Sequence, residues 1–212
     1  CKREFKPQTK FQYSCLNYIT LQHIIETITG QSLRDFAKEN IFDILGMQYT
    51  DYLPTIQQQD GKWINTVACP WMDRIAPTEK QKDGSVLCGQ VHDPLARILN
   101  GGISGNAGIF SNANDIGILA AALLNGGEYN GHRILSPLGV KTMCTVPREL
   151  TAFGRTPGWD IFSPYASNKG DLFSPNTFGH TGYTGTSIII DPDNDTAVIL
   201  LVNAVHPEGR HS

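Results

Sequence analysis

The chain has 212 residues, with 17 lysine and arginine residues against 20 aspartate and glutamate residues and a formal net charge of −3 at pH 7. This balance offers no basic stripe that would bind nucleic acid or an anionic lipid surface. The mean hydropathy is −0.22, and no apolar run approaches the roughly 20 residues that a membrane-spanning helix needs. The length predicts one domain over residues 1–212, or one large and one small lobe, that can bury its own core.

The chain contains five cysteines, an odd number, and no pair has the C-x-x-C spacing of a zinc ribbon or a thioredoxin-type redox motif. Most of these thiols are expected to be buried or idle. Cys1 has a second interpretation, as a lipidated mature N-terminus. Because the histidines also lack a ligand spacing such as H-x-x-x-H, no metal site is expected. The cysteines are Cys1, Cys15, Cys69, Cys88 and Cys144.

Helical patterns dominate residues 13–150. Apolar residues from Leu16 to Ile28 recur on one side of a helix that Gly30 ends. Ser32 is expected to cap a second helix, with Asp35 completing a capping box. The remaining boundaries are Leu45 and Gly46 at the end of this second helix, Ser111 or Asn112 at the start of a third that runs through Leu123 to Gly126-Gly127, and Ser136-Pro137 at the start of a fourth.

The pattern changes over residues 151–212, which are expected to form antiparallel strands. Apolar, β-branched runs at 186–191 and 196–203 flank an aspartate-rich turn, which is typical of a hairpin. A glycine-containing strand from Phe178 to Thr184 is expected before them. The fold class is therefore α+β, a mainly helical lobe over residues 13–150 followed by an antiparallel-strand part.

Two further motifs are interpreted as structural. Asp191-Pro192-Asp193-Asn194-Asp195 imitates the start of a calcium loop, but Thr196 stands where that loop requires glycine, so we interpret it as a turn. The run Gly101–Gly108 lacks the Gly-Lys-Ser/Thr ending of a phosphate loop. Asn106 also replaces the second glycine that a hydrolase elbow around Ser104 requires. We interpret this run as a tight loop against which backbone packs, lining a cleft.

Two motifs far apart in the chain carry a more specific pattern. Tyr13-Ser14-Cys15 stands just before the first expected helix, and His180-Thr181-Gly182 lies in the glycine-containing strand. In order and spacing the chain resembles the serine β-lactamase and penicillin-binding-protein family, in the branch of class C β-lactamases, D-Ala-D-Ala carboxypeptidases and esterases. The first motif matches the family's Tyr-x-Asn element and the second its Lys/His-Thr-Gly strand. Other segments that look like this branch are Leu45-Gly46-Met47, Gly89-Gln90-Val91-His92-Asp93, Ala107-Gly108-Ile109-Phe110-Ser111 and Gly158-Trp159-Asp160.

The resemblance implies a β-lactamase/transpeptidase-like fold and acyl transfer through a serine, without metal or organic cofactor. It makes Tyr13 the general base that returns the proton to the leaving group, and the backbone N–H of Tyr183 an oxyanion donor. His180 and Thr181, with Gly182 beside them, would meet the carboxylate or polar tail of a small-molecule or peptidoglycan-like substrate. It also implies a periplasmic or extracytoplasmic location. Tyr13 and His180 are then expected to face a common cleft within roughly 10 Å, with the loop 101–108 nearby.

Two residues depart from the family pattern. Cys15 replaces the asparagine of the first motif, and a thiol lacks the paired donor and acceptor of an amide. His180 replaces lysine, so its positive charge at neutral pH is only partial. Both changes disfavour efficient hydrolysis of β-lactams and leave D-Ala-D-Ala-type peptidases and small-ester hydrolases open.

The family's nucleophile motif, Ser-x-x-Lys, is absent from the 212 residues, because no serine is followed by lysine three residues later. Together with the abrupt opening CKREFKPQTK, this predicts a C-terminal portion of a longer serine hydrolase, incomplete at the N-terminus and inactive alone. Its substrate would be a β-lactam, a D-Ala peptide or a small ester, and its partners other parts of the parent polypeptide. The alternative is a non-catalytic β-lactamase-like module that binds a peptidoglycan-like ligand or a neighbouring domain.

Overall fold

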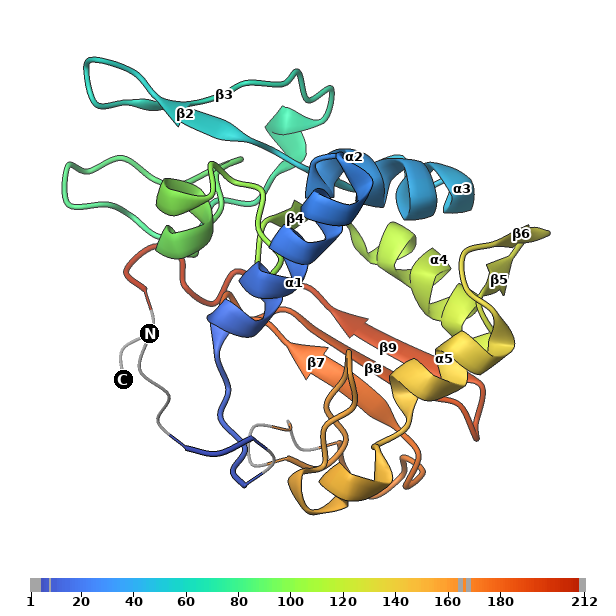
Figure 1. The fold of residues 1–212 in the computed structure, drawn as a ribbon. Coiled ribbons are helices and arrows are strands. Elements are labelled where there is room, and N and C mark those ends of the chain that lie inside the picture. Colours follow the sequence, from blue (N-terminus) through green and yellow to red (C-terminus); the bar gives the residue numbers. More distant parts are fainter. Residues whose placement is uncertain (1–4, 8, 164–165, 167–168, 210–212) are drawn as a thin grey trace.

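The computed structural model describes residues 5–7, 9–163, 166 and 169–209; Cys1 and its interpretation as a lipidation site lie outside them. The chain forms a mixed α+β fold whose expected helices are all present (Figure 1). They are α1 (Cys15–Thr29), α2 (Leu33–Ala37) continued by a π-helical turn (Lys38–Phe42) and α3 (Asp43–Leu45), α4 (Ala113–Leu124) and α5 (Pro137–Cys144).

The helix ends are set by the capping residues that the sequence indicates. Ser14 caps α1 with a side chain that accepts from the N–H of Leu16, and Gly30 ends it in the left-handed conformation, with φ of 70°. Asn112 caps α4 by accepting from the N–H of Asp115, and Ser136 caps α5 in the same way. The π-helical turn inside the second expected helix has no sequence signal of its own.

Three small antiparallel pairs interrupt residues 13–150, and the sequence patterns did not predict them. Each strand has only two or three residues, too few to show a period. The division of the chain near residue 150, into a mainly helical lobe and an antiparallel-strand part, stays a prediction. The pairs are β1 (Asp51–Tyr52) with β4 (Ile109–Phe110), β2 (Thr55–Gln57) with β3 (Trp63–Asn65), and β5 (Glu128–Tyr129) with β6 (His132–Arg133).

The expected C-terminal strands form one antiparallel sheet in the order β7 (Phe178–Thr181), β8 (Ser187–Asp191) and β9 (Thr196–Leu200). Strands β7 and β9 are both shorter than predicted, because β7 ends at Thr181 and β9 at Leu200. The N–H of Gly182 donates to the carbonyl of Thr186 at 2.7 Å and that of Gly185 to the carbonyl of Gly182 at 3.0 Å. These bonds close a tight turn, so Tyr183 lies in a turn and not in a strand.

Helix α4 connects the two apolar cores of the molecule. Ala122 belongs to a cluster with residues of α2, the π-helical turn, α3 and β1, such as Phe42 and Tyr52. Ala120 and Leu123, from the same helix, pack with Phe178 of β7 and Ile190 of β8 in the other cluster. Figure 1 shows α4 lying alongside the sheet, where it contacts β9. Burial of these apolar faces holds the helices against the sheet that carries His180.

The free cysteines of the described residues are Cys15, Cys69, Cys88 and Cys144. None of them is fully buried, and Cys88 is exposed. Burial nevertheless raises the pKa of Cys144 to about 11, so this thiol stays protonated and unreactive at neutral pH. Within the described part of the chain no helix is both long and apolar enough to cross a membrane.

The aspartate-rich segment is a hairpin turn, as predicted. The buried carboxylate of Asp191 accepts from the Ser174 hydroxyl at 2.6 Å, the Ser174 N–H at 2.9 Å and the Asn194 side-chain amide at 2.8 Å. Burial alone would raise the pKa of Asp191, but the hydrogen bonds from Ser174 and Asn194 outweigh it and hold the pKa far below its usual value. The carboxylate therefore fastens the segment before β7 to the hairpin.

Replacement of Asp191 by asparagine is expected to lower the free energy of unfolding by about 1–3 kcal/mol at pH 7, because buried donors lose a charged acceptor. Since the pKa of Asp191 is lower in the folded than in the unfolded state, this contribution is present above pH 4 and is lost as the pH falls below it. Urea unfolding at pH 7 and pH 3 tests this, with the exposed Asp171→Asn as control. An Asp191→Asn effect of equal size at both pH values would contradict it.

Candidate active site

Tyr13 directly precedes α1, and polar contacts hold this helix in place. The Tyr18 hydroxyl donates to the carbonyl of Pro157 at 3.2 Å. The Gln22 side chain donates to the carbonyl of Ile103 at 3.1 Å and accepts from the N–H of Gly105 at 3.0 Å. A Cβ atom on Gly105 would lie 2.1 Å from the Tyr18 carbonyl oxygen, so only glycine permits this approach. The interpretation of residues 101–108 as a close-packed loop is confirmed.

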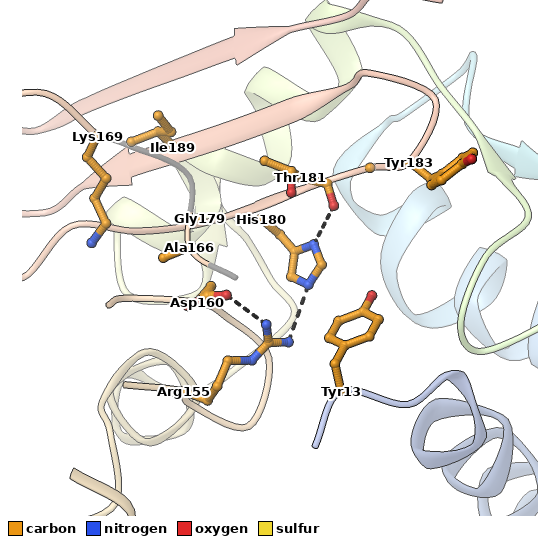
Figure 2. A pocket seen from close by; sticks show the side chains of 11 residues that line it. Tyr13, Arg155, Asp160, Ala166, Lys169, Gly179, His180, Thr181, Tyr183 and Ile189 are labelled. Carbon is orange, nitrogen blue, oxygen red and sulfur yellow. Dashed lines mark hydrogen bonds and ion pairs between the residues drawn. The ribbon is translucent and has the colours of Figure 1, made fainter. Parts of the chain in front are cut away.

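Tyr13 and His180 face each other, as the sequence predicted. Their ring centroids are 6.4 Å apart. Both side chains line a cleft of about 260 Å³, here called the first cleft, and Figure 2 shows the phenol directed toward the imidazole. The first cleft is also lined by predicted site residues Thr181, Gly182 and Tyr183. The geometric prediction is thus confirmed, whereas the roles of these residues stay predictions.

Cys15 lies in an adjoining hollow of about 190 Å³, here called the second cleft, which Tyr13 and His180 also line. Gly105 and Asn106 of the loop 101–108 also line the second cleft. The loop therefore borders the site, as expected. Cys15 reaches the second cleft from the first turn of α1, beside the capping residue Ser14.

The first cleft holds a charged pair that the sequence analysis missed. Arg155 Nη1 donates to Asp160 Oδ2 at 2.8 Å, and the two side chains are only 11% and 7% exposed. Arg155 Nη2 lies 3.3 Å from Nε2 of His180. Asp160 belongs to a segment that the sequence singled out, but no periodicity marks Arg155. Its place in the cleft depends on contacts between segments distant in the chain.

Backbone pairing anchors Asp160 on the strand that carries His180. The N–H of Asp160 donates to the carbonyl of Gly179 at 2.9 Å, and the N–H of Gly179 donates to the carbonyl of Asp160 at 3.0 Å. A Cβ atom on Gly179 would lie 2.3 Å from the carbonyl oxygen of Ile188, so this position requires glycine. The Asp160 carboxylate also accepts from the Ser163 N–H and hydroxyl. It is a structural anion and not a free base.

The environment of Tyr13 favours the protonated phenol. Burial raises the pKa of Tyr13 above 10.0, and the neighbouring Cys15 adds to this, whereas the Arg155 guanidinium lowers it. The guanidinium carbon lies 5.5 Å from the centroid of the Tyr13 ring. At neutral pH Tyr13 therefore holds its proton, and work as a base requires a further positive charge near its oxygen.

Tyr183 projects from the turn after β7, and its side chain is 63% exposed. Its ring stacks on His92, with centroids 5.5 Å apart. His92 Nε2 in turn lies 2.8 Å from a carboxylate oxygen of Glu79. His92 lies in a segment that resembles the family, but no sequence pattern predicts this contact with Tyr183. The stack supports the turn that holds the predicted oxyanion N–H of Tyr183.

Lys169 lines the far part of the first cleft, and its ammonium donates to the carbonyl of Thr177. Burial lowers the pKa of Lys169, while Asp160 and Asp191 raise it. Across the described residues, no group of three or more His, Cys, Asp or Glu side chains is placed to hold a metal ion. The described residues with titratable side chains that line the first cleft are Tyr13, Arg155, Asp160, Lys169, His180 and Tyr183.

The serines nearest the site have structural contacts. Ser104 is 1% exposed; its hydroxyl donates to the Asn106 side chain at 2.6 Å and accepts from the Asn100 side chain at 2.7 Å. Ser14 lines the second cleft but caps α1. Neither has a lysine three residues later.

A match over the whole chain decides the family. The family model described as "Beta-lactamase" matches residues 1–212. The chain belongs to the beta-lactamase family. A relative from Escherichia coli (strain K12), described as "Putative D-alanyl-D-alanine carboxypeptidase", is 36% identical over 217 residues, covering 96% of this chain and 47% of the relative. A relative of the same description from Salmonella gallinarum is 34% identical with the same coverage. The chain spans about half the length of the curated relatives it matches.

Solved structures of beta-lactamase fold match the same extent of chain. A beta-lactamase from Mycobacterium bovis matches with a TM-score of 0.60 and 19% identity, covering 98% of this chain and 60% of that one. EstCE1, described as a hydrolase with promiscuous acyltransferase activity, matches with a TM-score of 0.59 and 19% identity, covering 95% of this chain and 53% of that one. The α+β class and the beta-lactamase fold, over about half of its usual length, are thus confirmed.

Proposed function

We propose that this chain carries the tyrosine-and-strand half of the active site of a serine hydrolase, which forms an acyl-enzyme on an amide or an ester. The observation that carries the proposal is the pairing of Tyr13 and His180 across one cleft, with Thr181, Gly182 and Tyr183 in its wall. Membership of the beta-lactamase family supports it.

In this proposal the nucleophile is a serine of a Ser-x-x-Lys motif outside residues 1–212, next to Tyr13. The phenolate of Tyr13 takes the serine proton as the serine attacks the carbonyl carbon, and returns it to the leaving group. The lysine ammonium supplies the positive charge that Tyr13 lacks here. The backbone N–H of Tyr183 stabilises the oxyanion, and water then hydrolyses the acyl-enzyme.

The cleft and the relatives support a proposal for the substrate class. Curated relatives carry the description "Putative D-alanyl-D-alanine carboxypeptidase", and a peptide that ends in D-Ala-D-Ala ends in a carboxylate. In the first cleft, His180 and Thr181 lie where such a tail would meet the β7 edge, and Arg155 adds positive charge. We therefore place a D-Ala-terminated peptide or a small ester ahead of a β-lactam, and the parent protein outside the cytoplasm.

The test is acylation of the full-length protein. The full-length protein should hydrolyse p-nitrophenyl acetate or release D-alanine from the dipeptide D-Ala-D-Ala. A serine-directed phosphonate should inactivate it. Binding of the dipeptide without release of D-alanine and without phosphonate labelling would instead establish the non-catalytic alternative.

Cys15→Asn in the full-length protein is expected to raise turnover of an amide-bearing cephalosporin by about 10-fold, because the asparagine amide pairs with the substrate amide that the thiol leaves unsatisfied. Turnover of p-nitrophenyl acetate, which has no such amide, serves as the matched control and should change little. No gain on the cephalosporin would mean that the second cleft is shaped for a substrate without that amide.

A further inference from the structure

The contacts of His180 define which of its ring nitrogens carries the proton. A guanidinium has only N–H donors. Because Arg155 Nη2 lies 3.3 Å from His180 Nε2, this nitrogen must be the acceptor and carries no proton. The other nitrogen, Nδ1, lies 2.8 Å from the carbonyl oxygen of Thr181, which can only accept. Both contacts therefore require the same form, a neutral imidazole with its proton on Nδ1.

We infer that Arg155 is a positioning residue of this site: together with the Thr181 carbonyl it holds His180 as the neutral Nδ1–H tautomer, and it carries a positive charge of the first cleft beside the imidazole. This inference deepens the proposed function and rests on it, because the proposed function makes the first cleft the substrate-binding site. It differs from the expectation that His180 itself bears a partial charge, because the inferred charge lies on the neighbouring guanidinium of Arg155.

The guanidinium is held well enough to impose this form. Its Nη1 is bound to Asp160, whose carboxylate is further fixed by Ser163 and whose backbone pairs with Gly179 of β7. The rings of Tyr13 and Phe11 lie 5.5 Å and 5.8 Å from the guanidinium carbon. Figure 2 shows Arg155 held between Asp160 and His180 beside β7.

This arrangement changes what the cleft offers a substrate. The Nε2 lone pair of His180 is engaged by Arg155, so the imidazole does not donate a proton into the cleft. The carboxylate of Asp160 balances the positive charge of Arg155. Lys169 contributes a second cation to the cleft, and its ammonium donates to the neutral carbonyl of Thr177. A carboxylate in the first cleft is therefore recognised by a guanidinium in a fixed orientation, which favours a planar anion over a neutral group.

The tautomer can be measured without turnover. In the full-length protein with ¹⁵N-labelled histidine, long-range ¹H–¹⁵N spectra at pH 8 should show His180 with the proton on Nδ1. Arg155→Met should shift the ring toward the Nε2–H tautomer, while Arg148→Met, an exposed arginine outside both clefts, should not. Because Arg155→Met leaves a buried carboxylate unpaired, the variant Arg155→Met/Asp160→Asn repeats the measurement. An Nε2–H tautomer in the wild type, or an unchanged tautomer in both variants, would overturn the inference.

A kinetic cycle tests the location of the charge. Arg155→Met/Asp160→Asn should lower kcat/KM for the D-Ala-D-Ala dipeptide by about 10-fold or more. His180→Lys should impair the wild type, because it places an ammonium beside the guanidinium, but should partly restore kcat/KM in the double variant. Impairment by His180→Lys in both backgrounds would contradict a charge carried by Arg155. If the wild-type protein hydrolyses no substrate, the proposed function fails, and the tautomer measurement still decides the role of Arg155.

Discussion

Phenylalanine in place of Tyr13 is expected to lower kcat of the full-length protein for an activated ester by about 10²- to 10⁴-fold, the usual loss when a general acid–base group is removed. The substitution deletes one hydroxyl and keeps the ring that contacts Arg155 and His180. KM should therefore change little. Steady-state kinetics with p-nitrophenyl acetate give both constants.

A matched control separates this effect from a change in stability. Tyr129→Phe removes the hydroxyl of a tyrosine on β5 that lines neither cleft, and should leave kcat unchanged. Thermal unfolding of both variants shows whether the fold is retained. If Tyr13→Phe keeps kcat within threefold of the wild type while folded, Tyr13 is not the base, and the acyl-transfer proposal needs another proton acceptor.

The second large effect concerns the position of the nucleophile. A fluorescent phosphonate is expected to label the full-length protein on a serine outside residues 1–212 and to leave the chain of residues 1–212 unlabelled. Ser104 is enclosed by Asn100 and Asn106, and Ser14 caps a helix. Without the nucleophile, the remaining groups supply only weak residual catalysis. Intact-mass and peptide mass spectrometry locate the adduct.

Two controls keep this result interpretable. Circular dichroism of the chain of residues 1–212 shows whether it is folded when it fails to react. In the full-length protein, alanine at the labelled serine should abolish the adduct without unfolding the protein. A stoichiometric adduct on Ser14 or Ser104 would overturn the proposal that the nucleophile lies elsewhere.

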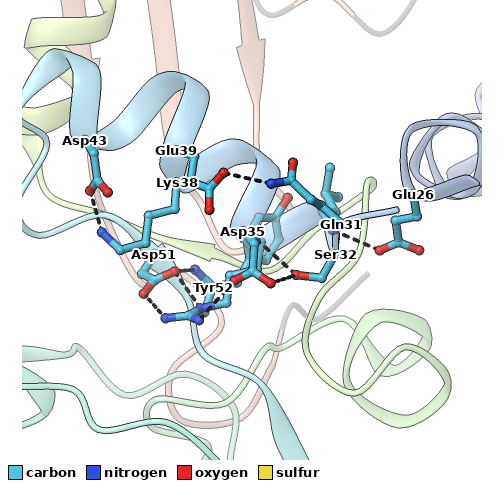
Figure 3. Close-up of polar contacts among 11 residues, drawn as sticks. Glu26, Gln31, Ser32, Asp35, Lys38, Glu39, Asp43, Asp51 and Tyr52 are labelled. Atoms are coloured by element: carbon cyan, nitrogen blue, oxygen red, sulfur yellow. Dashed lines mark hydrogen bonds and ion pairs between the residues drawn. The ribbon is translucent and has the colours of Figure 1, made fainter. Parts of the chain in front are cut away.

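Local chemistry made the helices predictable. Ser32 shows this: its hydroxyl accepts from the N–H of Asp35 at 3.1 Å and donates to the Asp35 carboxylate at 2.7 Å, so the expected capping box closes through the hydroxyl (Figure 3). Arg34, in the first turn of the same helix α2, forms a bidentate pair with Asp51, with distances of 2.9 and 2.6 Å. No rule of spacing predicts that second contact, because it depends on β1 lying against α2.

The same distinction applies to the candidate site. Tyr13 and His180 stand in short motifs, so a family resemblance indicated them before any coordinates. Arg155 stands in an irregular segment, and it enters the cleft only because Asp160 pairs with Gly179 across a long stretch of chain. Strand β7 ends earlier than predicted for a related reason. The turn in which the N–H of Gly182 donates to the carbonyl of Thr186 competes with extension of the strand beyond Thr181.

The way α1 is attached has a consequence for its dynamics. None of its residues is fully buried, and Leu16, Leu21, Ile24 and Ile28 are exposed. A helix that buries none of its residues fully belongs to the low-stability end of a structure, where amide hydrogens exchange through local opening without global unfolding. Since Tyr13 stands just before this helix, beside the capping residue Ser14, its alignment with His180 follows the opening equilibrium of α1. A surface that covers these apolar side chains lowers the population of the open form and thereby sharpens the position of the phenol.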